Sequence, residues 1–167
     1  MSARQFSRIA PGIFVLSLAS AAMARDGAGP LILPFDFSKS AVEIDVTVKS
    51  TPLHMILDTG VDPSVIDLAE TERLGLEVQR GEGGEASGFG DGKGESVFPT
   101  KIDGLAIAGH GFGRFEALAT DMREISADLG RKLDGVLGYS FLADKMVLID
   151  YPAQKAAILE RAGDAVS

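Results

Sequence analysis

The sequence predicts a mostly β domain, either a barrel or a sandwich, with one or two short helices. Short apolar runs of strand length recur along the chain, and the run at 41–49 alternates strictly between apolar and polar side chains. Turn-forming residues separate these runs, and segments with helical periodicity are few. The 167 residues, 46% hydrophobic and 24% charged, have the composition of a globular protein and suffice for one domain.

The first two predicted strands form a hairpin that ends on an acid. Residues 41–49 place valine and isoleucine on one face, and the turn is expected at Ser50-Thr51-Pro52. The near-continuous apolar run 53–57 then predicts a strand buried on both faces. Asp58 follows this strand directly.

The remainder of the chain is predicted to contain short strands, two helical turns and a glycine-rich hairpin. Helical turns are expected at 68–74, before Gly75, and a short strand at 76–79. The many glycines of 81–94 favour a mobile hairpin, with a plain surface loop as the alternative. Paired strands are predicted at 97–108 and 112–120 around a turn at 109–111, a helical turn at 139–144, and strands at 146–149 and 155–159, while 125–129 is ambiguous.

The first 24 residues have the features of a secretory signal peptide. Arg4 and Arg8 form a basic head, Ile13–Met23 is mostly apolar, and small residues precede a cleavage site after Ala24. As a helix, Ile13–Met23 spans only about 17 Å against a hydrocarbon core of about 30 Å, which favours a signal over an anchor. We therefore expect an exported protein, periplasmic or secreted, with an extended leader at 25–40, a domain at 41–160 and a flexible tail at 161–167.

Charge and cysteine content exclude several classes of function. Signal removal takes away two arginines and no acids, so the net charge changes from −8 to −10, which argues against nucleic acid or an anionic membrane as a partner. The absence of cysteine excludes disulfides, a thiol nucleophile and thiolate metal ligands. The two histidines, His54 and His110, lie far apart without a ligand at helical spacing, so we expect neither a metal site nor a cofactor.

Asp58, Thr59 and Gly60 are the candidate catalytic residues. A charged carboxylate at the end of an apolar strand costs free energy unless it is paired, so it is either a cap or a working group. Two neighbouring carboxylates share a proton, which lets a water between them attack a peptide carbonyl. Thr59 offers a hydroxyl that can tie loops together, and Gly60 lets the backbone pass where a Cβ would clash. Because the chain has one D-T-G and no D-S-G, the second Asp58 must come from a twofold-related copy.

This D-T-G motif and the later apolar segment Val136-Leu137-Gly138 resemble those of the retropepsin-like aspartic proteases. The resemblance extends from Ala41 to Leu159 and is greatest to exported bacterial members, through D-G-V-L-G-Y-S-F-L and V-L-I-D-Y. It implies an acid-protease barrel with one lobe per chain, a peptide or protein substrate, and a flap that covers the cleft. The flap residues expected at the substrate are Ser87, Gly88, Phe89 and Gly90. Val61 departs from the family, where Ala or Ser is usual, and this affects the shape of the cleft.

Other interpretations stay open. Asp58 could instead form a hydrogen-bonded turn at a strand end, the kind of role expected for the other acids of the chain. Asp62, Asp67 and Asp150 are expected to cap or turn, and Asp134 to be a turn residue, although it is a conceivable second carboxylate. The same fold could also serve as a noncatalytic peptide- or partner-binding module, or as an exported barrel that binds a small molecule.

Overall fold

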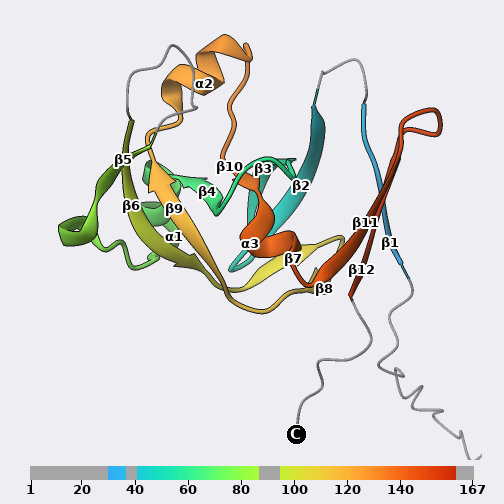
Figure 1. Cartoon of the computed structure of the whole chain (residues 1–167), viewed down its shortest axis with the longest axis horizontal. Helices are drawn as coiled ribbons and strands as arrows, with labels where there is room; N and C mark the ends of the chain where they lie inside the picture. The colour runs from blue at the N-terminus through green and yellow to red at the C-terminus, as the bar shows by residue number, and fades with distance from the viewer. Residues whose placement is uncertain (1–29, 37–40, 87–94, 161–167) are drawn as a thin grey trace, which may run out of the picture.

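The computed structural model describes residues 30–36, 41–86 and 95–160, which form two antiparallel-rich sheets with short helices around them (Figure 1). In spatial order, the nine-stranded sheet contains β5 (Gly84–Ala86), β6 (Glu95–Ile102), β9 (Phe115–Thr120), β4 (Ser64–Asp67), β10 (Gly135–Leu137), β3 (Thr51–Leu57), β2 (Val42–Val48), β7 (Leu105–Ile107) and β8 (His110–Gly111). The three-stranded sheet contains β1 (Leu31–Pro34), β12 (Lys155–Glu160) and β11 (Lys145–Asp150).

Three short helices accompany the sheets, where the sequence predicts one or two. They are α1 (Leu68–Leu74), α2 (Arg123–Asp128) and α3 (Tyr139–Leu142), and a 3-10 turn covers Arg80–Glu82. The expectation of a mostly β fold is confirmed. None of the helices in the described part of the chain is long and apolar enough to cross a membrane.

The predicted hairpin β2–β3 is confirmed, but its turn lies earlier than expected. The valines and isoleucine of β2 are buried, as its alternation predicts. Lys49 and Ser50 form the turn with φ of 48° and 67°, and Thr51 and Pro52 already belong to β3. Two positive φ values suit the twist of a two-residue hairpin turn, which usually carries Asn or Gly. The predicted position of the turn is wrong because the turn contains neither Asn nor Gly, so the sequence does not mark it.

Two further strand predictions are wrong. The expected strand 76–79 is reduced to a single bridge between Val78 and Thr100. The expected long strand 97–108 is broken at Gly104, whose φ of 73° ends β6 and starts β7. Accordingly β6 pairs with β9, while β7 pairs with β2 and with β8.

The helix α1 is confirmed and has recognisable signals at both ends. Asp67 is its N-cap and accepts a hydrogen bond from the Ala69 N–H at 3.2 Å. Gly75 ends the helix in the left-handed conformation at φ 61°. Burial raises the pKa of Asp67 above its ordinary value, although the Ala69 bond acts in the opposite direction. The helical turn predicted at 139–144 is confirmed as α3. The ambiguous segment 125–129 overlaps α2, which ends at Asp128.

The main hydrophobic core lies between the two sheets. It includes the inner faces of β2, β3 and β7, together with Phe112, Phe141 and residues of the three-stranded sheet. Leu33 of β1 belongs to this core, and Leu31–Pro34 pairs in register with β12. The folded sheet therefore begins before residue 41, inside the segment expected to be an extended leader.

We expect Leu33→Ala to lower the free energy of unfolding by about 2–5 kcal/mol, because it removes a buried side chain from the core. The matched control is Ile32→Ala on the opposite face of β1, where the side chain is exposed. That change should alter stability by less than about 0.5 kcal/mol. Urea unfolding of both variants measures the difference, and equal values would show that β1 is not part of the folded domain.

Candidate active site

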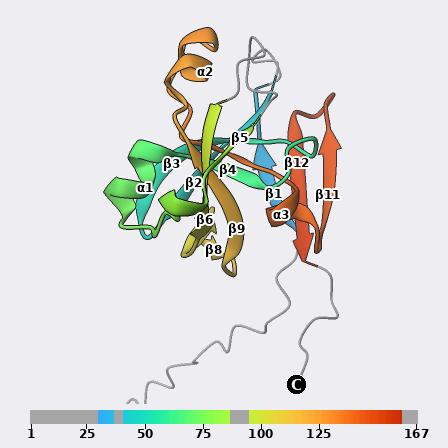
Figure 2. The same cartoon turned by 60° about the vertical axis from the view of Figure 1, so that its left-hand side comes forward.

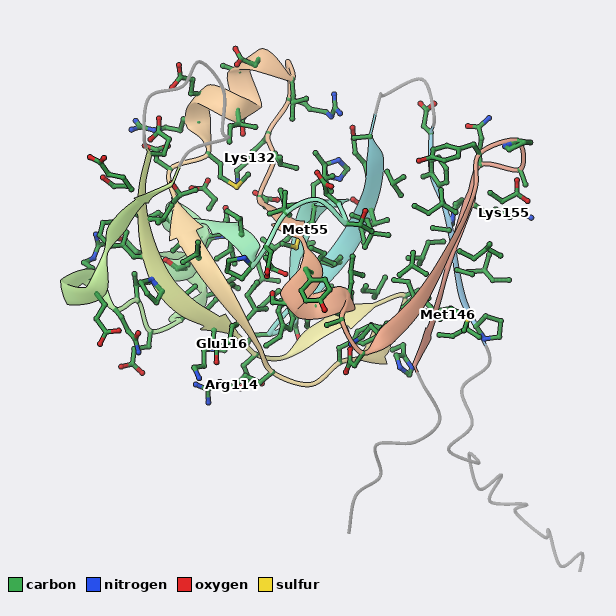
Figure 3. All side chains as sticks on the ribbon, viewed as in Figure 1. Met55, Arg114, Glu116, Lys132, Met146 and Lys155 are labelled. Atoms are coloured by element: carbon green, nitrogen blue, oxygen red, sulfur yellow. The ribbon has the colours of Figure 1, made fainter. Side chains whose placement is uncertain are left out.

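The strand β10 brings together two segments that are far apart in sequence. It pairs in parallel with β3 on one side and antiparallel with β4 on the other. Gly135 permits this insertion, because a Cβ there would lie 2.3 Å from Met55 Cε and 2.5 Å from the Val65 carbonyl oxygen. Met55 is fully buried near the middle of the molecule (Figure 3). Because β3 and β10 run in parallel, Asp58 emerges beside the end of β10.

The Asp58 side chain is exposed at the end of β3. Leu53, Met55 and Leu57 of this strand are buried, whereas His54 and Ile56 are only partly buried, so the prediction of burial on both faces is wrong.

The Asp58 backbone N–H donates to the Leu137 carbonyl oxygen at 3.1 Å, and its Oδ1 accepts from the Gly60 N–H at 2.8 Å. A Cβ on Gly60 would lie 3.2 Å from the same Oδ1, so glycine leaves room for this bond. Asp58 Oδ2 accepts no hydrogen bond from any residue that the structure describes. One carboxylate oxygen is therefore held and the other is accessible.

Thr59 lies beside Asp58 and is also exposed. Its hydroxyl makes no hydrogen bond within the described ranges of this chain. The predicted role of Thr59, to tie two loops together, stays a prediction that requires a second loop.

The chain crosses itself closely where the Asp58 loop passes Gly138. A Cβ at Gly138 would lie 2.3 Å from the Val61 carbonyl oxygen and 3.4 Å from that of Pro63. The next residue, Tyr139, donates its N–H to the Val61 oxygen at 2.7 Å. Position 138 therefore requires glycine, because its backbone lies against Val61, the residue that follows Asp58-Thr59-Gly60.

Two serines connect the same segments, and the sequence reasoning missed them. The Gly138 N–H donates to Ser64 Oγ at 3.0 Å, and the Ser64 N–H donates to Ser140 Oγ at 2.8 Å. The two hydroxyl oxygens are 2.9 Å apart, and Ser140 also donates to the Glu116 carbonyl oxygen at 2.7 Å. The sequence did contain a signal for this contact. Ser64 lies six residues after the Asp of Asp-Thr-Gly, and Ser140 lies six residues after the Asp of Asp-Gly.

Val61, the departure from the family pattern, has a packing partner. It is half-buried against a small second apolar cluster that lies beneath α2. The buried members of this cluster are Val65, Met122, Leu133 and Val136. Contact with this cluster accounts for a side chain larger than alanine at position 61.

Asp134, expected to be a turn residue, is instead buried and holds β10 to β3. Its Oδ2 accepts the His54 N–H at 2.7 Å, and its own N–H donates to the His54 carbonyl oxygen at 2.8 Å. Lys132 Nζ lies 2.7 Å from Asp134 Oδ1 and 2.5 Å from Glu70 Oε1. Hydrogen bonds to Asp134 and then to Glu70 raise the pKa of Lys132. Because its carboxylate is already engaged, Asp134 does not pair with Asp58.

His54 is half-exposed and lies between two acids of β2. Its Nε2 is 2.8 Å from Glu43 Oε2, and its Nδ1 is 2.8 Å from Asp45 Oδ1. Arg131 also contacts Glu43, which links β2 to the segment after α2. The described ranges contain no group of three or more metal-ligating side chains suited to an ion.

The arms of the expected flap are present. β5 pairs antiparallel with the start of β6, so the chain forms a hairpin here. Arg80 lies over the Phe98 ring at 5.6 Å, and a Cβ at Gly83 would lie 2.7 Å from that ring. The predicted tip residues Ser87, Gly88, Phe89 and Gly90 lie outside the described residues.

Comparison with known proteins identifies the fold and family. A family model described as aspartyl protease matches residues 44–141. A retropepsin-like aspartic protease from Rickettsia conorii superposes with a TM-score of 0.55 at 16% identity, over 79% of this chain and 99% of that chain. The retroviral protease-like domain of Ddi1 from Leishmania major gives a TM-score of 0.47 at 15% identity, over 74% and 90% of the respective chains. No curated protein sequence matches significantly.

The fold is therefore retropepsin-like, as the sequence predicts. The chain belongs to the aspartyl protease family.

We expect Gly138→Ala to destabilise the fold by about 1–3 kcal/mol or more, because the new methyl group meets backbone atoms that cannot move independently. Gly113→Ala is the matched control, since a Cβ there has no neighbour within 4 Å. The control should change stability by less than about 1 kcal/mol. Denaturant unfolding of the two variants tests this close crossing, and a harmless Gly138→Ala would contradict it.

Proposed function

We propose that the protein is an aspartic endopeptidase whose active site contains Asp58 from two copies of the chain. The observation that carries the proposal is the exposed Asp58 carboxylate at the end of β3, an interior strand of the nine-stranded sheet. Its Oδ1 is fixed by the Gly60 N–H, and its Oδ2 is accessible. Asp67 accepts the same kind of backbone hydrogen bond, from the N–H two residues on, but its carboxylate is buried, as is that of Asp134, whereas Asp58 is exposed.

A second copy would supply the other carboxylate, because the acid conceivable as a partner within one chain is engaged elsewhere in the described structure. Asp134 is the conceivable partner within one chain, but it is buried and bonded to His54 and Lys132. A twofold axis beside the loop would bring two Asp58 side chains together and give each Thr59 hydroxyl a second loop to contact. The homodimer is thus part of the proposed mechanism.

The proposed reaction is the hydrolysis of a peptide bond without a covalent intermediate. Two close carboxylates share one proton, so one of them is basic while the other is acidic. The basic Asp58 takes a proton from water as the water oxygen bonds to the carbonyl carbon, and the acidic Asp58 protonates the carbonyl oxygen. Cleavage of the C–N bond then releases the amine, which receives a proton from the pair, while a hydroxyl of the tetrahedral intermediate returns its proton to the pair as the new carboxylic acid forms.

The proposed substrate is a peptide or protein, as the resemblance to the family implies. The β5–β6 hairpin would lie over bound peptide, with Ser87 to Gly90 as contact residues. We further propose that the chain acts after export, in the periplasm or outside the cell, without a cofactor. Its negative charge disfavours nucleic acid and membrane surfaces as partners.

A second candidate function is a noncatalytic module that binds peptide or a partner in the same cleft. Val61 is the reason to keep this alternative, since Ala or Ser is usual at this position in the family, although its side chain packs against the cluster beneath α2. The two functions differ in the role of the Asp58 carboxylate. A protease needs it for turnover, whereas a binding module does not cleave its ligand.

We expect Asp58→Asn to abolish cleavage of unfolded polypeptide while leaving stability nearly unchanged, because the side chain is exposed and Asn keeps the Gly60 hydrogen bond. A loss of at least about 10³-fold in kcat/KM corresponds to about 4 kcal/mol of transition-state stabilisation. Asp103→Asn, an exposed acid in the turn before β7, is the control and should retain full activity. Activity assays from acidic to neutral pH decide the matter. Equal cleavage by wild type and Asp58→Asn, or none by the wild type, would reject the protease.

A further inference from the structure

The strand β10 is apolar on both faces, so burial alone specifies its position along β3 only weakly. Its three residues pair in parallel with Met55, Ile56 and Leu57. Val136 packs in the cluster beneath α2, and Leu137 packs in the main core on the other face. The position of a strand is strongly specified where one face is apolar and the other polar, and β10 lacks this contrast.

The two glycines of β10 and its end limit its displacement only in part. Gly135 and Gly138 lie in contacts that leave no room for a Cβ, so a slip by a whole residue would bring a larger side chain into them. A smaller shift meets no such obstacle. A displacement of about 1 Å at a catalytic group nevertheless lowers a rate by about 100-fold. Other contacts are therefore needed to hold β10 in place along β3.

Asp134 makes such contacts at the entry of β10. Its N–H donates to the His54 carbonyl oxygen at 2.8 Å, and its Oδ2 accepts the His54 N–H at 2.7 Å. The backbone of Asp134 thus binds one side of the His54 peptide backbone, and its side chain binds the other. Together the two hydrogen bonds fix both the separation of the strands and the position of Asp134 along β3.

The segment that leads into β10 is anchored to two further elements. Arg131 contacts Glu43 of β2, and Lys132 Nζ lies between Glu70 Oε1 of α1, at 2.5 Å, and Asp134 Oδ1, at 2.7 Å. Figure 2 shows this orange segment crossing the middle of the molecule between α2 and α3, and Figure 3 marks Lys132 near its α2 end. The three carboxylates are buried, and the best-attested use of such buried polar groups is to fix one register.

The other end of β10 holds the loop that carries Asp58. The Leu137 carbonyl oxygen accepts the Asp58 N–H at 3.1 Å, and the next residue, Gly138, lies against Val61. Positions 134 and 137 are about 10 Å apart along an extended strand. Because an extended chain does not shorten, a shift at the entry of β10 moves its far end as well. Asp134 and Asp58 therefore tie β3 to β10 at the two ends of their pairing.

We propose that Asp134 is a positioning residue for the reaction, because its carboxylate fixes β10 along β3 and thereby places the Asp58 carboxylate. The inference rests on the proposed function, since it concerns the same active-site loop. Asp134 touches neither the substrate nor the reacting atoms. Its effect passes through the Leu137 carbonyl oxygen and the contact of Gly138 with Val61.

The first test compares steady-state cleavage of one peptide at a temperature at which circular dichroism shows every variant to be folded. We expect Asp134→Ala to lower kcat at least about tenfold while KM changes less than about threefold, because the substrate contacts are kept and the Asp58 carboxylate is displaced. Asp134→Asn should keep kcat within about threefold of the wild type, because its amide oxygen still accepts the His54 N–H.

Ile107→Val is the control for a general loss of stability. Ile107 is fully buried in β7, which is separated from β10 by β3 and β2, and the change removes one methylene group from the core. This variant should unfold at a lower urea concentration and keep the kcat of the wild type. A folded Asp134→Ala chain with wild-type kcat, or an Asp134→Asn chain as slow as Asp134→Ala, would overturn the inference while leaving the protease proposal intact.

The second test requires no cleavage, so it is independent of the proposed function. Hydrogen exchange of the Asp58 N–H, followed by NMR, reports whether its bond to Leu137 is kept. The reference is the Phe112 N–H, which donates to the Leu105 carbonyl oxygen at 2.8 Å on the β7–β8 side of the sheet. We expect Asp134→Ala to raise the ratio of the two exchange rates at least about tenfold, and Asp134→Asn and Ile107→Val to change it less than about twofold.

The two tests separate failure of the inference from failure of the protease proposal. An unchanged exchange ratio in Asp134→Ala would overturn the positioning role, whatever the chain cleaves. If the wild-type chain cleaves nothing but the ratio rises as expected, the protease proposal fails, and Asp134 is still shown to hold the Asp58 loop.

Discussion

The close backbone contact between Gly138 and Val61 is the constraint on which the candidate site depends. No side chain fits between these segments, since a Cβ on Gly138 would lie 2.3 Å from the Val61 oxygen. The same oxygen accepts the Tyr139 N–H, and Ser64 accepts the Gly138 N–H. As a result the loop that carries Asp58 has little freedom, because any movement would break hydrogen bonds to β10 and α3 together.

This rigidity would favour the proposed catalysis by paired carboxylates, which requires their positions to be set before substrate binds. The structure separates the acids of this region by environment. Asp67, Glu70 and Asp134 are buried and hydrogen-bonded, so their carboxylates stabilise helix α1 and the β3–β10 pair. Asp58 alone among these four acids is exposed, with one oxygen fixed and the other accessible.

Local sequence patterns were sufficient for the elements that carry the site. The alternation of β2, the apolar run of β3 and the capping residues of α1 each depend on neighbours in sequence, so they could be read directly. The D-T-G motif and the later glycine could be located for the same reason. The contact between Gly138 and Val61 explains why position 138 is a glycine. From the sequence alone, this glycine could be singled out only through the resemblance to the family.

What the sequence could not show depends on contacts between distant segments. The pairing of β1 with β12 joins residues more than 120 positions apart, and no local pattern distinguishes such a strand from an extended leader. The division of 97–108 follows from pairing with two different neighbours, β9 and β2. The Ser64–Ser140 contact and the link from Asp134 to His54 likewise appear only after β10 is inserted between β3 and β4.

The central claim, that each active site contains two Asp58 carboxylates from two chains, is tested most directly by mixing subunits. Wild-type and Asp58→Asn chains are allowed to exchange at a fixed total concentration, and cleavage is measured against the wild-type fraction. If both carboxylates are needed, activity follows the square of that fraction, so an equal mixture retains about one quarter of the activity. Activity that falls in direct proportion to the wild-type fraction would show that each chain acts alone and would contradict the account.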